Sequence, residues 1–184
     1  MTARKKKRRP IREYGWREMV GLPDLAIPCL RAKIDTGART SALHATRQRL
    51  LRIDDEDWVE FHVPVPGTDR STRCKARLVD RRQIKNTSGI AEERFVIRTM
   101  LIIAKRKWPI ELSLANRDNM GFDLILGRTA VRRRNILINP GRSYLAGPPA
   151  NKNSNAAKNS VSESAKRTSR SKEEKRREHR HART

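Results

Sequence analysis

The sequence has few of the residues that build disulfide-stapled or membrane-spanning proteins. Among its 184 residues it contains two cysteines, three Trp, two Tyr and three Phe. It has no apolar run of about 18 or more residues, so no transmembrane helix is expected. No apolar stretch follows the basic N-terminus, which argues against a secretory signal. Because two cysteines cannot make a disulfide framework, a reducing cytoplasm is the expected setting.

Motifs for metals and nucleotides are also missing. The sequence contains no CxxC, HxxxH or HExxH spacing and no Gly-rich phosphate loop of the GxxxxGK[ST] type. Cys29, Cys74, His44 and His62 would form a zinc site only if the fold brought them together. Ordinary buried thiols are the simpler interpretation. We therefore expect no metal and no cofactor.

Negative charge is scarce and unevenly distributed. Twenty Asp and Glu stand against 43 Lys and Arg, which gives a net charge of +23. Residues 1–9 carry +6, residues 10–149 carry +10 and residues 150–184 carry +7, and every aromatic residue lies in the middle segment. Segments with so few apolar side chains cannot offset the entropy lost on ordering.

This compositional break predicts three segments. We expect a disordered basic arm over residues 1–10, a folded domain over residues 11–147, and a disordered, basic, low-complexity tail over residues 148–184. Arms of this kind neutralise phosphates without reading sequence, and without aromatic residues they offer no base stacking. One functional hypothesis is therefore a basic protein that associates with nucleic acid or the ribosome.

The middle segment has the pattern of a β-protein. Runs of β-forming residues separated by turns predict strands over residues 27–34, 57–65, 72–79, 94–99, 100–104, 108–115, 122–126 and 135–139. One short helix is expected over residues 128–133. This pattern predicts a mainly β fold, a small closed barrel with mostly antiparallel strands. The polar stretch 85–94 around Gly89 is a candidate flap over a site, or an exposed hairpin without a function.

One short motif is suited to chemistry. Asp35-Thr36-Gly37-Ala38 follows the apolar Ile34 at the end of a predicted strand. The strand anchors the backbone, Gly37 permits an unusual turn and Thr36 can hydrogen-bond within the loop, so Asp35 could serve as a working carboxylate. The same motif is also typical of an Asx turn that only closes a strand.

A wider pattern favours the first interpretation. A D-T-G-A loop, an apolar segment that ends at Gly127, a short helix and a last strand resemble the retropepsin-like aspartic peptidase fold. The match is closest to a bacterial retropepsin-like family often labelled "ATP-dependent zinc protease", whose members occur alone or beside ATP-grasp ligases of the type that adds glutamates to ribosomal protein S6. The matching blocks are residues 15–18, 32–45, 96–99, 108–112, 116–122, 126–128 and 142–145.

The resemblance implies that Asp35 is catalytic and that Thr36, Gly37 and Ala38 form the active-site loop. Aspartic peptidases use two carboxylates that share a proton, because like charges about 3 Å apart cannot both ionise. One D-T-G per chain therefore implies a homodimer, with Asp35 of each protomer meeting on the two-fold axis. The words "zinc" and "ATP-dependent" in the family label have no matching motif in this sequence.

Four further residues are candidates for substrate or dimer contacts: Arg39, His44, Gly127 and Arg128. For two of them a structural role is equally open. His44 could serve only the fold, and Arg128 could pair with an acid such as Asp118 or Asp35 and stabilise a dimer.

Two other polar residues receive no catalytic role in this interpretation. Asp123, just before the apolar segment, is interpreted as a surface charge, with a supplementary acid as the alternative. Ser41 has no partner histidine at an obvious spacing, so a serine nucleophile is rejected.

The resemblance thus implies an aspartic-type peptidase active as a homodimer, for which the cytoplasm is the expected setting. The domain's charge of +10 favours acidic, glutamate-rich peptides as substrates. The alternative is a nucleic-acid- or ribosome-associated binding protein built on a catalytically inactive peptidase fold.

Overall fold

The computed structural model describes residues 10–85, 89–118 and 120–150. In order, the elements are β1 (Arg12–Leu22), the 3-10 helix η1 (Pro23–Leu25), β2 (Ile27–Asp35), β3 (Ser41–His44), β4 (Thr46–Ile53), β5 (Glu56–Pro64), β6 (Ser71–Lys85), β7 (Ala91–Ile103), β8 (Arg106–Ala115), β9 (Leu124–Gly127), α1 (Arg128–Val131) and β10 (Ile136–Ser143). Both predicted arms lie almost wholly outside the described residues, so the three-segment division stays a prediction. Within the described residues, no helix has the length and apolarity to cross a membrane.

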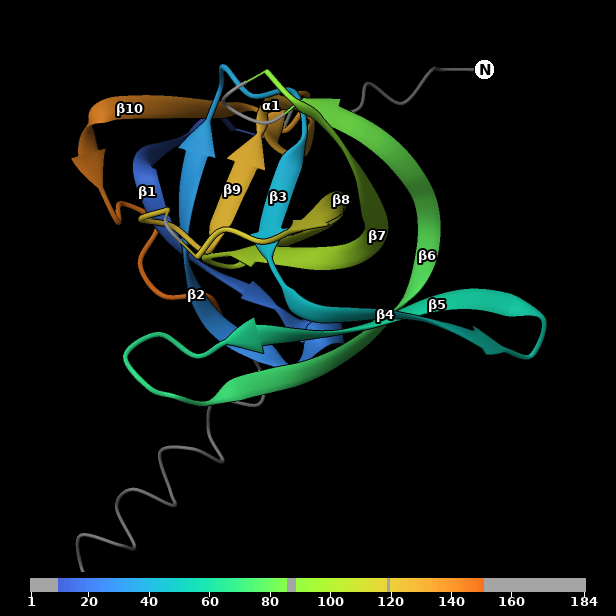
Figure 1. Cartoon of the computed structure of the whole chain (residues 1–184). Helices are drawn as coiled ribbons and strands as arrows, with labels where there is room; N and C mark the ends of the chain where they lie inside the picture. Colours follow the sequence, from blue (N-terminus) through green and yellow to red (C-terminus); the bar gives the residue numbers. More distant parts are fainter. Residues whose placement is uncertain (1–9, 86–88, 119, 151–184) are drawn as a thin grey trace, which may run out of the picture. The chain divides into compact units, whose positions relative to one another are not determined.

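Six of these strands close into a barrel, whose shape can be followed in Figure 1. The neighbours run β1, β2, β9, β3, β8 and β7, and β7 returns to β1 through Val20↔Ile103 and Gly21↔Ile102. Outside this closure, β10 lies beside β1, while β6, β5 and β4 extend the sheet from β7. Figure 1 shows β4 and β5 projecting from the barrel as a hairpin. The mainly β closed barrel with one short α-helix confirms the predicted fold class.

Three strand pairs are parallel, and two of them position the candidate site. β2 runs parallel to β9, β3 runs parallel to β8, and β1 runs parallel to β10. The remaining pairs along the sheet are antiparallel, for example β7 with β8. The parallel pairing of β2 and β9 brings Asp35, at the end of β2, opposite Gly127, at the end of β9.

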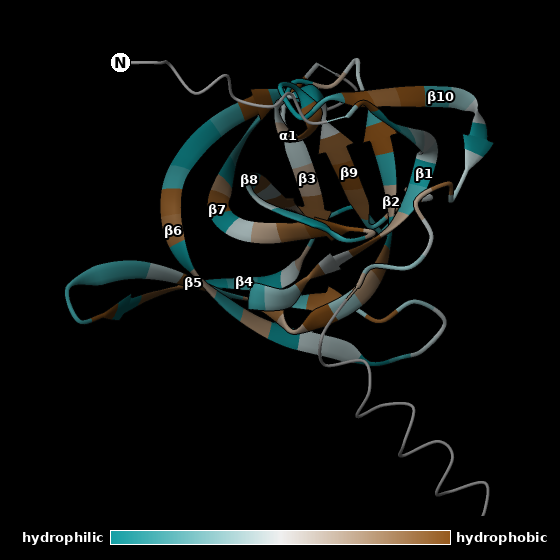
Figure 2. Cartoon of the chain, turned by 180° about the vertical axis from the view of Figure 1, so that it is seen from behind, coloured by the Kyte–Doolittle hydropathy of each residue, from teal (hydrophilic) through white to brown (hydrophobic). Residues whose placement is uncertain are grey.

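Side-chain alternation separates the core from the candidate site. On β2, Leu30, Ala32 and Ile34 are buried, whereas Lys33 and Asp35, which alternate with them, are partly exposed. Figure 2 shows β9 as hydrophobic along most of its length, and both Leu124 and Leu126 are fully buried. Each fully buried leucine contributes about 1.5–3 kcal/mol, so this packing fixes which face of β2 carries Asp35.

Three strands were not predicted: β1, β3 and β4. β1 contains Gly15, Gly21 and interspersed charges, which hide its alternation, yet it pairs with β2, β7 and β10. β4 carries charged residues along much of its length because it is a sheet edge. β3 is only four residues long.

Several predicted boundaries were also wrong. β7 is one strand where two were expected, and it forms the predicted hairpin with β8. β10 continues past Pro140, which an edge strand tolerates because no neighbour needs the missing N–H. The helix ends at Val131, since Arg132 already has an extended backbone.

Candidate active site

The loop after Asp35 folds back over the end of β9. Gly127 lies directly beneath it, and a Cβ at this position would overlap the Thr40 carbonyl and lie 2.9 Å from the Arg39 carbonyl oxygen. Because the neighbours are backbone atoms that cannot swing away, only glycine allows this approach. The predicted importance of Gly127 therefore has a steric origin, the contact of two backbones.

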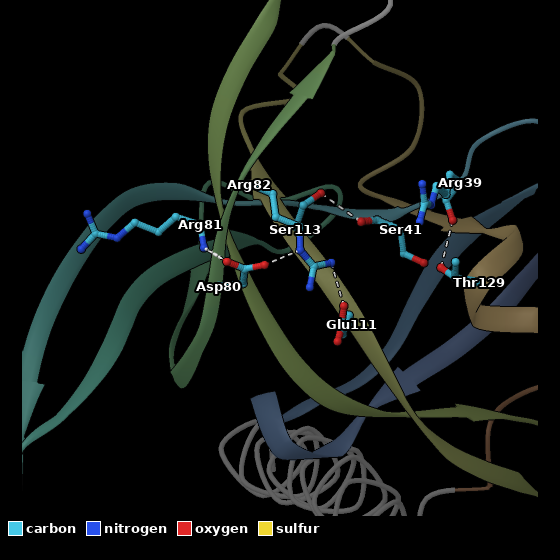
Figure 3. Close-up of polar contacts among 8 residues, drawn as sticks. All are labelled: Arg39, Ser41, Asp80, Arg81, Arg82, Glu111, Ser113 and Thr129. Carbon is cyan, nitrogen blue, oxygen red and sulfur yellow. Dashed lines mark hydrogen bonds and ion pairs between the residues drawn. The ribbon is translucent and has the colours of Figure 1, made fainter.

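Hydrogen bonds from α1 and β9 hold the loop in place. The Arg128 N–H donates to the Ala38 carbonyl at 2.9 Å, and the Thr129 hydroxyl donates to the Arg39 carbonyl at 2.9 Å. On the other side, the Gly127 N–H donates to the Ser41 hydroxyl at 3.1 Å. Ser41 is buried, and its own carbonyl accepts a bond from Ser113 at 3.0 Å (Figure 3). Ser41 is thus a structural anchor.

The Asp35 carboxylate is held at a defined orientation. One oxygen, Oδ1, accepts hydrogen bonds from the N–H groups of Gly37 and Ala38, both at 3.1 Å. The other, Oδ2, lies 3.4 Å from the Lys33 ammonium, and the side chain is 31% exposed. Burial alone would raise the pKa of Asp35, but the Ala38 N–H, the Lys33 charge and the Gly37 N–H together lower it.

Lys33 is the site residue that the sequence interpretation missed. It precedes Asp35 by two positions on one strand, so both side chains leave the same face of the sheet. That spacing is a signal the sequence contains. Within one chain, Asp35 pairs with Lys33 and Asp118 with His44. The pairing of Arg128 with Asp35 or Asp118 that would stabilise a dimer stays a prediction.

Arg128 instead lines an open groove beside the active-site loop. The groove also includes Thr36, Val131, Arg132, Ile136 and Leu137. It extends from the loop to the edge strand β10, and its walls combine arginines with aliphatic side chains. The prediction that Arg39 and Arg128 contact a substrate or a second chain stays a prediction, and both residues lie next to the loop as that prediction requires.

His44 lies at the other end of β3 from Ser41 and Gly127. Its buried ring accepts a bond at Nδ1 from the Arg117 N–H at 2.9 Å, so Nε2 carries the proton and faces Asp118 at 3.1 Å. Its backbone N–H donates to the Asp123 carbonyl. These contacts give His44 a structural role in the loop before β9. Its predicted substrate or dimer contact, like the role of the Asp123 side chain, stays a prediction.

The β6–β7 hairpin lies beside the active-site loop. Arg82 and Ile84 of β6 line a small pocket together with Thr40, Ser41 and Thr129. The Arg82 guanidinium is fixed by Asp80 at 2.6 Å and by Glu111 of β8 at 2.8 Å (Figure 3). The described part of the candidate flap therefore has a suitable position, and residues 86–88 lie outside the described residues.

The thiols and histidines do not gather at one place. Cys29 is exposed, whereas Cys74 is buried with its thiol against the Leu25 carbonyl, and burial raises the pKa of Cys74 to about 11. Among the residues that the structure describes, no three His, Cys, Asp or Glu side chains are placed to share a metal ion.

Known proteins resemble the chain in sequence and in fold. Two relatives named "Probable alpha-L-glutamate ligase" are 46% identical over 128 residues (Desulfotalea psychrophila) and 41% identical over 135 residues (Parasynechococcus marenigrum). These matches cover 68% and 72% of this chain but only 27% and 29% of the relatives, so the chain spans less than a third of their length.

A solved structure shares the fold. It is the crystal structure of Lpg0085, a protein of unknown function from Legionella pneumophila, with a TM-score of 0.63 and 26% identity over 73% of this chain and 97% of that one. The family model described as "Retropepsin-like aspartic endopeptidase RimB" matches residues 13–149, which include the Asp35 loop, Gly127 and nearly all of the barrel. The chain therefore belongs to the RimB-like family of retropepsin-like aspartic endopeptidases.

Proposed function

We propose that this chain is a cytoplasmic aspartic-type peptidase that works as a homodimer. The observation that carries the proposal is the Asp35 carboxylate at the end of β2, partly exposed and oriented by two backbone N–H groups of the loop that follows. Such a carboxylate is held ready to receive a proton from water, while its backbone donors keep it from rotating.

A single Asp35 supplies only half of the required chemistry. With its pKa lowered, the carboxylate is ionised at neutral pH and can act as a base but not as an acid. A second Asp35 at about 3 Å would raise the pKa of one member of the pair, because two negative charges repel. One carboxylate then deprotonates the attacking water while the other protonates the peptide group.

The surface next to Asp35 is suited to a second copy of the chain. β10 has a free edge in the described sheet, and exposed apolar side chains flank it, with Leu137 at 59% and Ile11 at 66% exposed. The groove lined by Thr36 and Leu137 connects this edge to the active-site loop. Free strand edges and exposed apolar groups favour pairing with another chain.

Acidic peptides are the proposed substrate class. Lys33, Arg39 and Arg128 surround the loop, and the domain carries +10, so its field attracts negatively charged chains. The relatives' name concerns the ligation of glutamate. Glutamate-rich peptides are therefore the first substrates to test, with glutamine-rich peptides of equal length as the control.

A mixing experiment tests the two-Asp requirement directly. Wild-type protein and Asp35→Asn protein are combined in equal amounts and allowed to exchange subunits. If both carboxylates are needed, only wild-type dimers work and the activity per total protein falls to about one quarter of the all-wild-type value. A value of about one half, the result for independent protomers, would contradict the dimeric mechanism.

The nucleic-acid alternative rests on the basic arms and stays a prediction. Deleting residues 1–9 and 151–184 removes segments rich in Lys and Arg. If the arms bind RNA, this deletion lowers both the affinity and its dependence on salt. Unchanged affinity and slope would assign any RNA binding to the barrel.

A further inference from the structure

Arg17 of β1 is enclosed by aromatic rings and by one hydrogen bond. Its guanidinium carbon lies 4.2 Å from the centre of the Trp16 ring and 5.8 Å from the centre of the Tyr144 ring. Its Nε donates to the Ser143 hydroxyl at 3.1 Å. Trp16 is itself held by an edge-on contact with Phe122, with ring centres 6.0 Å apart. The guanidinium is therefore fixed before any ligand arrives, as recognition of a planar anion requires.

Arg17 belongs to the arginines that have no ion-pair partner among the described residues. Six arginines of the described residues pair with carboxylates, among them Arg73 with Glu60 and Arg82 with Asp80 and Glu111. No carboxylate of the described residues lies within ion-pair distance of Arg17. With Nε occupied by Ser143, the terminal nitrogens are left to form the paired hydrogen bonds that suit a carboxylate.

The position of this enclosure connects it to Asp35. β2 lies between β1 and β9, and Arg17 is paired directly with Lys33, whose ammonium contacts Asp35. Directly paired residues leave the same face of a sheet with Cβ atoms about 5 Å apart, and Asp35 is about 7 Å further along β2. An extended peptide repeats its same-side side chains at about that spacing.

We propose that Arg17 is a binding residue for a carboxylate of the peptide substrate that lies beyond the bond cleaved at Asp35, on the β10 side of β1 toward which the guanidinium extends. The site, which rests on the proposed function, comprises Arg17 with its supports Trp16, Tyr144 and Ser143. It receives a glutamate or aspartate side chain through two parallel N–H···O bonds. In this proposal the preference for acidic peptides comes from one fixed side chain, Arg17, and not from net charge alone.

A structural role for Arg17 is the competing explanation, because Arg17 contacts Ser143, which ends β10, and Tyr144, which follows it. The Arg17 carbonyl also accepts the Tyr144 N–H at 2.8 Å. That backbone bond survives any change of the Arg17 side chain, and the aromatic contacts tolerate a lysine better than a neutral residue. Arg17→Lys therefore keeps the charge and the packing, but it removes the planar guanidinium and its paired N–H donors.

The test measures binding without turnover. In an Asp35→Asn background at 0.15 M salt, fluorescence anisotropy follows the binding of labelled hexaglutamate and hexaglutamine. We expect Arg17→Gln and Arg17→Lys to weaken hexaglutamate binding about 10-fold or more, as for a charge-assisted pair, and to leave hexaglutamine binding unchanged. The matched control is Arg31→Gln, which removes one exposed positive charge from the same face of β2, where Arg31 pairs with Met19. We expect this control to weaken hexaglutamate binding less than about 3-fold.

The outcomes separate the two proposals. If Arg17→Lys, with an unchanged melting temperature, binds hexaglutamate as tightly as the parent, the site is wrong. If Arg17→Gln and Arg31→Gln lower the affinity for hexaglutamate equally, the effect is one of net charge alone. That result would also overturn the proposed site. The peptidase proposal fails separately, if wild-type protein hydrolyses none of these peptides, because binding is measured on protein that has no catalytic carboxylate.

Discussion

Two carboxylates in this barrel are held in similar ways and have different consequences. Asp35 accepts hydrogen bonds from the backbone N–H groups of Gly37 and Ala38, and Glu18 accepts them from Gly15 at 2.6 Å, Leu145 at 3.0 Å and Ala146 at 3.1 Å. Asp35 is 31% exposed, whereas Glu18 is 0% exposed. Backbone donors therefore fix a carboxylate, and its exposure decides whether it can meet a substrate.

The two groups also differ in what they connect. Glu18 joins β1 to the segment after β10, and Gly15 allows the close approach, since a Cβ there would lie 2.7 Å from the Ser143 Cα. Asp35 joins only residues of its own loop and leaves Oδ2 toward Lys33 and solvent. Both belong to blocks that match the family, so the match alone does not distinguish a catalytic carboxylate from a structural one.

The largest expected effect comes from Asp35→Asn. Removing the proton acceptor should lower peptide hydrolysis by about 10²–10⁴-fold or more, while the free energy of unfolding changes by no more than about 0.5 kcal/mol at this partly exposed position. Steady-state kinetics and urea denaturation measure the two quantities. If Asp35→Asn still hydrolyses peptides, Asp35 has no part in the mechanism. Asp35 would then be a structural carboxylate, as Glu18 is.

Gly127→Ala should disturb the Asp35 loop without touching the carboxylate. The new Cβ would overlap the Thr40 carbonyl, so the backbone must shift, and overpacking of this kind costs about 1–3 kcal/mol. We expect lower activity as well as lower stability. Gly121→Ala is the matched control, because no atom lies within 4 Å of a Cβ built there. Equal behaviour of the two variants would contradict the steric role of Gly127.

Glu18→Gln should lower stability and spare the chemistry. The amide keeps one acceptor oxygen but places an NH₂ group against backbone donors in a fully buried site, at a cost of about 1–3 kcal/mol. Urea denaturation reports the loss. The turnover number per folded molecule should match the wild type, and a specific loss of turnover would give Glu18 a role in the active site.

Lys33→Met should move the titration of Asp35. Because the Lys33 cation lowers the pKa of Asp35, its removal raises that pKa, and the acid limb of the pH profile of kcat/KM shifts to higher pH. The lowered pKa of Asp35 also makes the stability of the protein depend on pH. A lowered folded pKa stabilises the protein above the unfolded value of about 3.9, and this stabilisation is lost as the pH falls through the folded pKa. Lys33→Met should therefore lose part of this stabilisation. If the acid limb of the kcat/KM profile does not move, the Lys33 charge does not influence the titration of Asp35.

Arg82→Gln should give the smallest effect. Its ion pairs with Asp80 and Glu111 are partly exposed, so we expect a loss of stability of no more than about 1 kcal/mol. Urea denaturation at low and high salt measures it, because screening should shrink the difference from the wild type. A loss as large as that of Glu18→Gln would mean that burial is not what separates strong from weak carboxylate contacts here.

Local signals explain why the Asp35 loop was predictable. Asp35-Thr36-Gly37 is contiguous, and the segment ending at Gly127 has an apolar pattern that is readable without a fold. The enclosure of Arg17 was not predictable, because its hydrogen-bond partner Ser143 lies 126 positions away. β1 was missed for the same reason, since Gly15 is explained only by Arg142 and Ser143 of β10, whose backbone lies close to it.

The pairing of β1 with β10 has a consequence for biogenesis. Arg12 pairs with Ile136 and Arg17 with Ser143, so one side of β1 stays without its partner until nearly the whole domain has been synthesised. At about 5–20 residues per second, β1 waits for several seconds as an exposed strand on the translating ribosome. Contacts of such high sequence separation also slow folding. Truncation before Ile136 should therefore yield nascent chains that need a chaperone, however intact the Asp35 loop is.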